Sequence, residues 1–243
     1  MANHRQQTRV NYGFDGSPFS VLFVFCMGII CLKAGGTLTS FHIILLTISG
    51  VFLFTLGSFI IFICGSYFYY VTIGKRQRMA AMLSLVAWNG TETVLDVGTG
   101  RGLLMIGAAK KLTIGKSIGI DIWNSSDMHG NTPQNTMRNA ELEGVLEKVE
   151  VRDDDVRSLS FANASFDVVL SNLCLHNIPT EAERTAACKE IARVLKPHGV
   201  AIIADKSHTK QYGEIFAAEG LSVESFRPCF DGSLRAMVKA VKK

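Results

Sequence analysis

The sequence lacks the features by which many small proteins bind metals, form disulfides or bind nucleic acid. Its six cysteines form no C-x-x-C pair, and three of them lie within apolar runs near the N-terminus. This spacing argues against a disulfide framework and a structural zinc site, and it favours reduced, buried thiols. The formal net charge is only +4, and no basic stripe with interleaved aromatic residues occurs. We therefore expect no metal ion and no nucleic-acid partner.

Charge is almost absent from a long stretch near the N-terminus. From Phe41 to Tyr70 the only ionisable side chains are His42 at the start and three tyrosines at the end. Crossing the hydrocarbon core of a bilayer takes about 20 apolar residues, and this run is longer. Three basic residues within 75–78 follow the tyrosines, a pattern typical of the cytoplasmic end of a spanning helix. The sequence therefore predicts a transmembrane helix at about 41–70.

An earlier apolar run, Phe19–Leu32, is shorter and stops at Lys33. It reaches spanning length as a helix at about 18–36, and residues 33–40 then form a short loop between two antiparallel helices. A re-entrant or interfacial segment is the alternative. A secretory signal peptide fits poorly, because polar and mixed residues precede the run and no clear cleavage site ends it. We expect a multi-pass, integral membrane hairpin with the following domain in the cytoplasm.

After the basic residues, short β-rich runs alternate with helical segments. The expected strands are 93–97, 117–121, 149–152, 166–171, 200–205, 221–226 and 234–240. The expected helices are 76–86, 103–112, 135–144 and 181–195. This alternation predicts an α/β fold with a Rossmann-like, doubly wound, mostly parallel seven-stranded sheet. The last two strands form an antiparallel pair with a turn at Asp231-Gly232. We expect a tail and membrane anchor over 1–74 and a catalytic domain over 75–243.

A glycine-rich run leads directly from the first of these strands into a helix. Glycines stand at 98, 100 and 102, where they let the backbone turn tightly and approach a ligand. A dinucleotide site would have its third glycine at the position of Leu103. The acidic residue before the glycines, Asp96, disfavours a pyrophosphate and suits a ligand with a positive pole. The pattern therefore points to S-adenosylmethionine, whose methionyl end carries an ammonium group.

Several further motifs follow in an order that suggests a family. They are Asp96–Gly102, Gly119–Asp121, Asp154–Val156, Ser165–His176 and Arg193–Gly199, the last with His198 in place of one glycine. With this set, residues 75–243 resemble the class I S-adenosylmethionine-dependent methyltransferases, in the broad group that includes the ubiquinone/menaquinone C-methyltransferases.

The resemblance implies S-adenosylmethionine as the methyl donor and assigns roles around it. Asp121 corresponds to the acidic residue that holds the ribose hydroxyls. Asp155 is favoured at the adenine ring, and a slip of one residue would select Asp154. The polar loop 127–134, with Trp123, forms either a lid over the donor or a plain surface loop. The residues expected around the donor are Asp96, Gly98, Thr99, Gly100, Gly102, Asp121, Ile122, Asp154, Asp155, Val156 and Asn172.

Candidate catalytic residues follow the fourth and fifth strands. His176 could act as a general base toward a hydroxyl or an acidic carbon, or it could only shape the turn. Asp205 and His208 lie at the exit of the fifth strand and face the same crevice, unless they belong to a solvated loop. Cys174, between two leucines, is interpreted as core packing rather than as a nucleophile or a ligand for a soft metalloid.

Methyl transfer by direct in-line displacement needs mainly positioning and exclusion of water. The predicted anchor suggests a small, hydrophobic acceptor dissolved in the membrane, such as a quinone, lipid, sterol or thiol. The anchor either only tethers the enzyme or also helps to present this substrate. A non-catalytic S-adenosylmethionine-binding module tethered to the membrane is the main alternative, and a nucleotide-dependent oxidoreductase is the other. The oligomeric state is left open.

Overall fold

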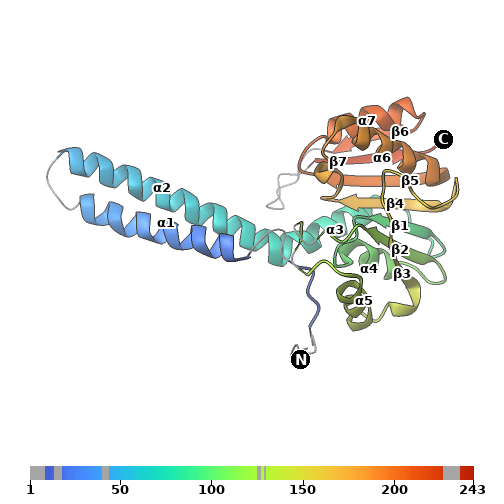
Figure 1. Cartoon of the computed structure of the whole chain (residues 1–243), viewed down its shortest axis with the longest axis horizontal. Helices are drawn as coiled ribbons and strands as arrows, with labels where there is room; N and C mark the ends of the chain where they lie inside the picture. Colours follow the sequence, from blue (N-terminus) through green and yellow to red (C-terminus); the bar gives the residue numbers. More distant parts are fainter. Residues whose placement is uncertain (1–8, 14–17, 40–43, 125–126, 129, 227–235) are drawn as a thin grey trace. The chain divides into compact units, whose positions relative to one another are not determined.

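The computed structural model describes residues 9–13, 18–39, 44–124, 127–128, 130–226 and 236–243 (Figure 1). The chain divides into two compact units, Phe14–Lys75 and the remainder of the chain. The short segment at residues 9–13 groups with the large domain. This differs from the division expected at residue 74, which placed the whole N-terminal part with the anchor.

The smaller unit is a helical hairpin of α1 (Pro18–Thr39) and α2 (Ile44–Tyr69), which run side by side (Figure 1). Their backbones approach closely at two pairs of glycines. A Cβ atom added at Gly35 would lie 2.6 Å from the carbonyl oxygen of Gly50, and one at Gly57 would lie 2.7 Å from that of Gly28. Small residues of this kind let apolar helices pack at short distance.

The helix expected at about 18–36 is present and continues to Thr39, so the loop expected at 33–40 is wrong for residues 33–39. The glycine contact at Gly35 continues the pairing with α2 beyond Lys33, which extends the helix. Both helices expose many large apolar side chains, and Phe23, Phe52 and Phe62 are each more than half exposed. By length and composition alone, two helices of the described chain could cross a membrane. A single π-helical turn, η1 (Tyr70–Gly74), follows α2.

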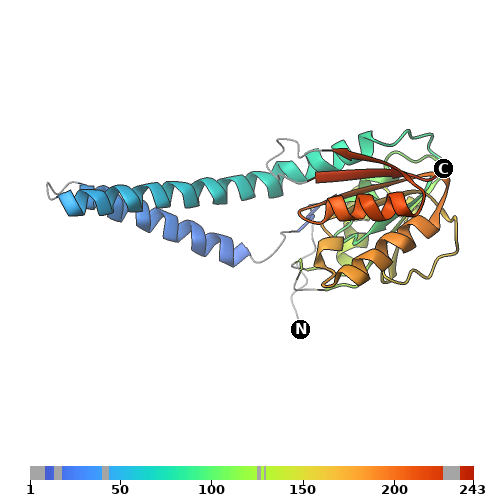
Figure 2. The same ribbon diagram turned by 90° about the horizontal axis from the view of Figure 1, so that it is seen from above.

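The large domain is built on one sheet of seven strands (Figure 2). The strands are β1 (Thr93–Val97), β2 (Lys116–Asp121), β3 (Val149–Asp153), β4 (Phe166–Asn172), β5 (Leu195–Asp205), β6 (Ser222–Phe226) and β7 (Ala236–Val241). Their order is β3-β2-β1-β4-β5-β7-β6. The strand β7 runs antiparallel to both β5 and β6, and the other neighbouring strands are parallel. This confirms the predicted mostly parallel sheet with a terminal antiparallel pair. The predicted turn at Asp231-Gly232 lies outside the described residues.

Helices cover both faces of the sheet. They are α3 (Lys75–Ser84), α4 (Leu103–Ala109), α5 (Pro133–Leu142), α6 (Glu181–Val194) and α7 (Thr209–Ala218). Successive strand residues point to opposite faces, and the two core clusters follow this alternation. Leu95 and Val169 pack with α6 and α7, whereas their neighbours Val94 and Val168 pack with α3 and α4. The helix α5 packs beside α4 and against β3.

The junction between α6 and β5 differs from the prediction. We expected the helix to continue to Leu195 and the strand to begin at Val200, with Pro197 between them. Instead β5 begins at Leu195, which pairs with Phe166 before the register shifts in β4. The shift accommodates Pro197 within the strand, since a proline cannot donate a ladder hydrogen bond. Two short 3₁₀ turns, η2 (Leu146–Lys148) and η3 (Leu175–Asn177), were not predicted.

Candidate functional site

Polar residues gather where the parallel strands of the domain end. Asp121, Asp153, Asn172 and Asp205 are the last residues of β2, β3, β4 and β5, and Asp96 is the last but one of β1. The chain crosses from one side of the sheet to the other between β1 and β4, which are neighbours in the strand order. Ligands of such sheets bind at this switch point, outside the carboxyl ends of the strands. The structure therefore brings the main predicted residues to the expected edge.

The glycine-rich loop after β1 has the backbone conformation that only glycine adopts easily. Gly98, Gly100 and Gly102 have φ values of 69°, 54° and 85°. A Cβ atom at Gly98 would also lie 2.4 Å from the Sγ atom of Cys174. The N–H groups of Gly98 and Thr99 both donate to the carbonyl oxygen of Ile120, each at 2.9 Å. The loop is thus tied to the end of β2.

The carboxylate of Asp96 lies behind this loop and is almost completely buried. Its Oδ2 atom accepts hydrogen bonds from Thr99 Oγ1 at 2.8 Å and from the N–H of Met105 at 2.9 Å. Burial raises the pKa of Asp96 to about 7, and the negative charge of Asp121 adds to this effect. A buried carboxyl group with a raised pKa gains from a nearby positive charge, which would favour its ionised form.

Asp121 joins β2 to the glycine-rich loop. Its Oδ2 atom accepts the N–H of Gly100 at 2.8 Å. Its Oδ1 atom accepts the N–H of Trp123 at 2.8 Å and the side-chain amide of Asn131 at 3.2 Å. Oδ1 thus already accepts two bonds, whereas Oδ2 accepts one and has a second lone pair, so Asp121 can still receive a hydroxyl group of a ligand.

The predicted adenine side lies at the exits of β2 and β3. Ile122 is 63% exposed although it is a large apolar residue, and Val156 is buried. The indole N–H of Trp123 donates to Asp153. Asp154 accepts hydrogen bonds from the N–H and the hydroxyl of Ser160. An exposed isoleucine beside these polar groups offers an apolar surface on which a planar ring could rest.

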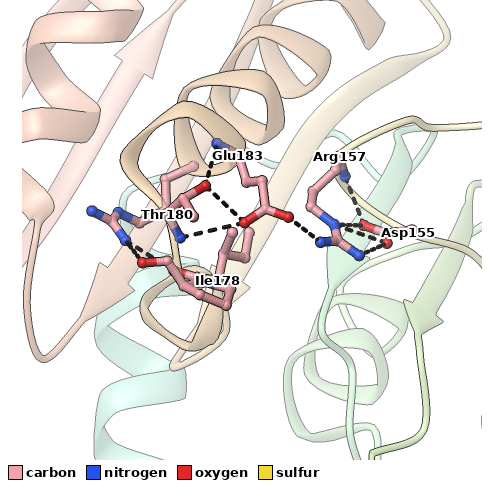
Figure 3. A network of polar contacts seen from close by, with 7 residues as sticks. Asp155, Arg157, Ile178, Thr180 and Glu183 are labelled. Atoms are coloured by element: carbon pink, nitrogen blue, oxygen red, sulfur yellow. Dashed lines mark hydrogen bonds and ion pairs between the residues drawn. The ribbon is translucent and has the colours of Figure 1, made fainter.

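Asp155, the favoured adenine ligand, takes part in a different network (Figure 3). Arg157 contacts Asp155 at 2.6 Å and Glu183 at 2.6 Å. Glu183 in turn forms a capping box with Thr180 at the start of α6. The guanidinium group of Arg157 holds the pKa of Asp155 below its usual value. The carboxylate of Asp155 therefore ties the β3 exit to α6.

The acceptor candidates His176 and Asp205 form a close pair. Nδ1 of His176 lies 2.5 Å from Oδ1 of Asp205, and the backbone N–H of His176 donates to Oδ2 at 2.9 Å. The N–H of Lys206 donates to Oδ1 at 2.8 Å. Asp205 is almost completely buried, and the side chain of His176 is 9% exposed. Two residues that the sequence offered separately thus act as one unit.

His208 lies apart from this pair. It precedes α7 with a φ of 63°, and it is exposed. Its ring centroid lies 6.5 Å from that of Tyr212, and among the described residues no hydrogen bond joins it to His176 or Asp205. The described geometry therefore gives His208 no role beside the pair.

Two buried groups near the pair complete its surroundings. Burial and the charge of Asp205 raise the pKa of Tyr212, whose hydroxyl has no hydrogen-bond partner among the described residues. Burial and the charges of Asp121, Asp205 and Asp96 raise the pKa of Cys174. A neutral thiol packed over Gly98 agrees with the interpretation of Cys174 as a packing residue.

Sequence reasoning missed two residues of α5 that hold the glycine-rich loop from behind. Thr136 Oγ1 donates to the carbonyl oxygen of Gly100 at 2.6 Å, and Asn139 Nδ2 donates to that of Arg101 at 2.9 Å. Both side chains are completely buried. Their spacing of three residues, which places two polar groups on the buried face of a helix, is the signal that could have found them.

The comparison with protein families matches this same part of the chain. Residues 95–203, from β1 to β5, fit the family described as a methyltransferase domain. This part of the chain is similar to a methyltransferase domain, and we refer to it by that name. The match agrees with the resemblance drawn from the motifs.

Curated relatives match the methyltransferase domain over part of their length. Over 140 residues the chain is 33% identical to the ribosomal protein L11 methyltransferase of Syntrophotalea carbinolica. The aligned region covers 57% of this chain and 40% of that protein. Over 128 residues the chain is 31% identical to the 2-methyl-6-phytyl-1,4-hydroquinone methyltransferase of Synechocystis sp. This aligned region covers 50% of this chain and 36% of that protein. The chain thus spans less than half the length of these relatives.

Solved structures share the fold of the methyltransferase domain. A SAM-dependent methyltransferase from Aquifex aeolicus superimposes with a TM-score of 0.56 at 19% identity, over 68% of this chain and 89% of that chain. The 4+2 cyclase SpnF superimposes with a TM-score of 0.57 at 16% identity, over 69% and 81%. Because a cyclase shares the fold, the fold alone does not decide the reaction, and the site residues must carry that argument.

Proposed function

We propose that the protein is an S-adenosylmethionine-dependent methyltransferase, anchored in a membrane by the hairpin α1–α2, that methylates a small hydrophobic acceptor. The observation that carries this proposal is the arrangement of the glycine-rich loop between two carboxylates. Asp96 lies behind the loop and Asp121 beside it, and Gly100 is bonded directly to Asp121. The glycines allow the tight backbone turn of the loop, and the carboxylates supply the negative charge that a cationic donor needs.

The residues of this site fit the donor at three points. The buried carboxylate of Asp96 favours the ammonium group, Asp121 can accept a ribose hydroxyl, and the exposed face of Ile122 can support the adenine ring. The donor, when bound, supplies an electrophilic methyl group on its sulfonium. The contribution of the chain is to orient this group toward an acceptor and to exclude water.

The pair of His176 and Asp205 supports proton removal from the acceptor. Nδ1 of His176 lies against Asp205, so Nε2 is the nitrogen left to accept a proton from the acceptor. An acceptor with a phenolic hydroxyl or an acidic ring carbon would benefit from such a base.

The hairpin supports a membrane-dissolved acceptor and an integral, multi-pass location with the domain in the cytoplasm. Its helices expose many large apolar side chains, as lipid-facing helices do, and basic residues follow α2 in the sequence. The relative from Synechocystis, whose name gives a prenylated hydroquinone as its substrate, supports an acceptor of this chemical class. Lipids, sterols and hydrophobic thiols share the required solubility.

The test uses the full chain in detergent micelles. We expect the chain to bind S-adenosylhomocysteine in a calorimetric titration, and Asp121→Asn to weaken this binding about 10–100-fold, since it removes a charged hydrogen-bond partner. The matched control is Asp167→Asn, which alters a half-buried aspartate near the opposite end of β4 and should leave the affinity unchanged.

Activity is then measured as transfer of a labelled methyl group to quinols and to lipid extracts. Transfer by the unaltered chain, but not by Asp121→Asn, would support the enzyme. Binding without transfer to any of these acceptors would favour a tethered, non-catalytic donor-binding module. A folded chain that does not bind the donor product would overturn the proposal.

A further inference from the structure

The segment at residues 9–13, which precedes the hairpin in the sequence, is packed on the methyltransferase domain. The N–H of Asn11 donates to Oδ1 of Asn139 at 3.1 Å, and its carbonyl oxygen accepts from Nδ2 of Asn139 at 2.9 Å. The hydroxyl of Tyr12 donates to Glu143 at 2.9 Å, and Arg76 lies over the Tyr12 ring. The segment is therefore held by backbone and side-chain contacts together.

The same Asn139 side chain holds the glycine-rich loop. Its Nδ2 atom donates both to Asn11 and to the carbonyl oxygen of Arg101, each at 2.9 Å. An amide NH₂ group has two hydrogens, so both bonds can exist at once. Asn139 is completely buried, and each of its bonds is therefore costly to leave unmade. One buried amide thus links the N-terminal segment to the loop.

A second contact runs through Met128. A Cβ atom at Gly13 would lie 2.9 Å from Cδ of Arg101 and 3.0 Å from Sδ of Met128. On its other side Met128 reaches the loop, because a Cβ atom at Gly100 would lie 3.1 Å from its Cε. Gly13 has a φ of 73°, which other residues rarely adopt. The segment is therefore fitted closely against Arg101 of the glycine-rich loop and against Met128, which in turn contacts Gly100.

We propose that residues 10–13 are positioning residues of the donor site, which hold the glycine-rich loop ready for S-adenosylmethionine through Asn139 and Met128. This inference rests on the proposed function. Three glycines in left-handed conformations have much freedom to lose when a ligand binds. A segment that restricts them beforehand lowers the ordering cost and raises the affinity. By thermodynamic linkage, a bound donor must strengthen the docking of the segment by the same factor.

The first test removes the side chain that anchors the segment. In the full chain in detergent micelles, we expect Tyr12→Ala to weaken binding of S-adenosylhomocysteine roughly 5–10-fold. The KM for the donor should rise while kcat stays nearly unchanged, because the segment does not touch the acceptor pair. The matched variant Tyr12→Phe keeps the ring against the core and loses only the bond to Glu143, so it should retain most of the affinity.

The second test needs no substitution. Hydrogen exchange of the unaltered chain should slow in residues 10–13 when S-adenosylhomocysteine is added, whereas peptides from β6 at the far edge of the sheet should not change. Absence of this protection would overturn the inference, as would a folded Tyr12→Ala variant with full donor affinity. If the unaltered chain binds no donor product at all, the proposed function fails instead, so the two failures are distinguishable.

Discussion

At the scale of single residues, the site depends on a carboxyl group in an unfavourable place. Asp96 is buried behind the glycine-rich loop, and burial raises its pKa to about 7. Only the ionised form attracts the ammonium group of a donor. The affinity for the donor should therefore depend on the protonation state of Asp96.

We expect the affinity for S-adenosylhomocysteine to rise roughly 5–10-fold between about pH 6 and about pH 7.5, because Asp96 of the ligand-free protein loses its proton over this range. Titration calorimetry of the full chain across this range measures the effect. The variant Asp96→Asn should bind more weakly, with a nearly flat profile. An equal slope in the variant would assign the titration to another group.

The same residue should lower the stability of the ligand-free chain. Its folded pKa lies above the unfolded value of 3.8, so its contribution is favourable at low pH and is lost as pH rises toward about 7. At about pH 7.5 we therefore expect ligand-free Asp96→Asn to unfold at a higher temperature than the unaltered chain. One kcal/mol corresponds to about 2–4 °C in a domain of this size. Thermal scans in detergent would show it, and a lower Tm would contradict it.

The pair of His176 and Asp205 gives the third prediction. Asp205→Asn should lower kcat about 10–100-fold, because Asp205 contacts both the ring and the backbone N–H of His176 and holds the ring in place, and it should leave the affinity for the donor nearly unchanged. Steady-state rates with saturating donor measure this. Tyr212→Phe alters the same buried region without removing a described hydrogen bond, and it should keep kcat. Equal losses in both variants would indicate disturbed packing instead.

The sequence predicted residues whose role follows from local pattern, and missed those whose role follows from tertiary contact. Asp96 and Asp121 end or nearly end strands and stand beside glycines, so their place at the edge could be read directly. The contact of His176 with Asp205 joins residues 29 positions apart, and their spacing in the sequence does not predict it. His198, which replaces a family glycine, has a φ of 64° and so keeps the turn that the glycine would make.

At the scale of elements, α6 is fixed at its start by the network shown in Figure 3. The side chain of Thr180 accepts the N–H of Glu183, and Glu183 bonds back to Thr180 and outward to Arg157. The exposed ion pair adds little in water. The capping bonds satisfy N–H groups that the helix leaves open, so they account for most of the stabilisation.

We expect Thr180→Ala to lower the free energy of unfolding by about 1 kcal/mol, the usual cost of losing an N-cap. Thr185→Ala is the matched control, because Thr185 lies half-buried within the same helix and its hydroxyl donates to the carbonyl oxygen of Glu181 in the preceding turn. Chemical unfolding of both variants measures the difference. Equal effects would mean that the cap contributes nothing beyond helix propensity.

The strands were predictable here, whereas α7 was missed and element ends were less certain. Every predicted strand of the domain is present, because short apolar, β-rich runs such as those of β1 and β4 are typical of buried parallel strands. The start of β5 was missed because a proline at 197 predicts that no strand runs through this position. In the structure the strand begins before it, where Leu195 pairs with Phe166. Helical continuation to Thr39 was missed for a similar reason, since its support comes from Gly50 on the other helix.

At the scale of the whole molecule, the chain combines a hairpin that exposes apolar side chains with a domain that buries them. The exposed apolar surface of α1 and α2 would be unfavourable in water. A bilayer would remove that cost, and the pairing of the two helices would then come from close packing. The glycines at the helix contact are therefore the residues on which the hairpin should depend.

Two glycines of α2 allow this dependence to be tested with a matched control. A side chain at Gly57 would collide with the carbonyl oxygen of Gly28 at 2.7 Å, whereas one at Gly65 would meet nothing within 4 Å. We expect Gly57→Leu to separate the helices and Gly65→Leu to leave them paired. Because both changes add the same apolar side chain, membrane partition itself should be unaffected. Resonance energy transfer between labels on α1 and α2, in vesicles, should fall only for Gly57→Leu. Equal transfer in both variants would mean that the membrane, rather than the glycine contact, holds the hairpin together.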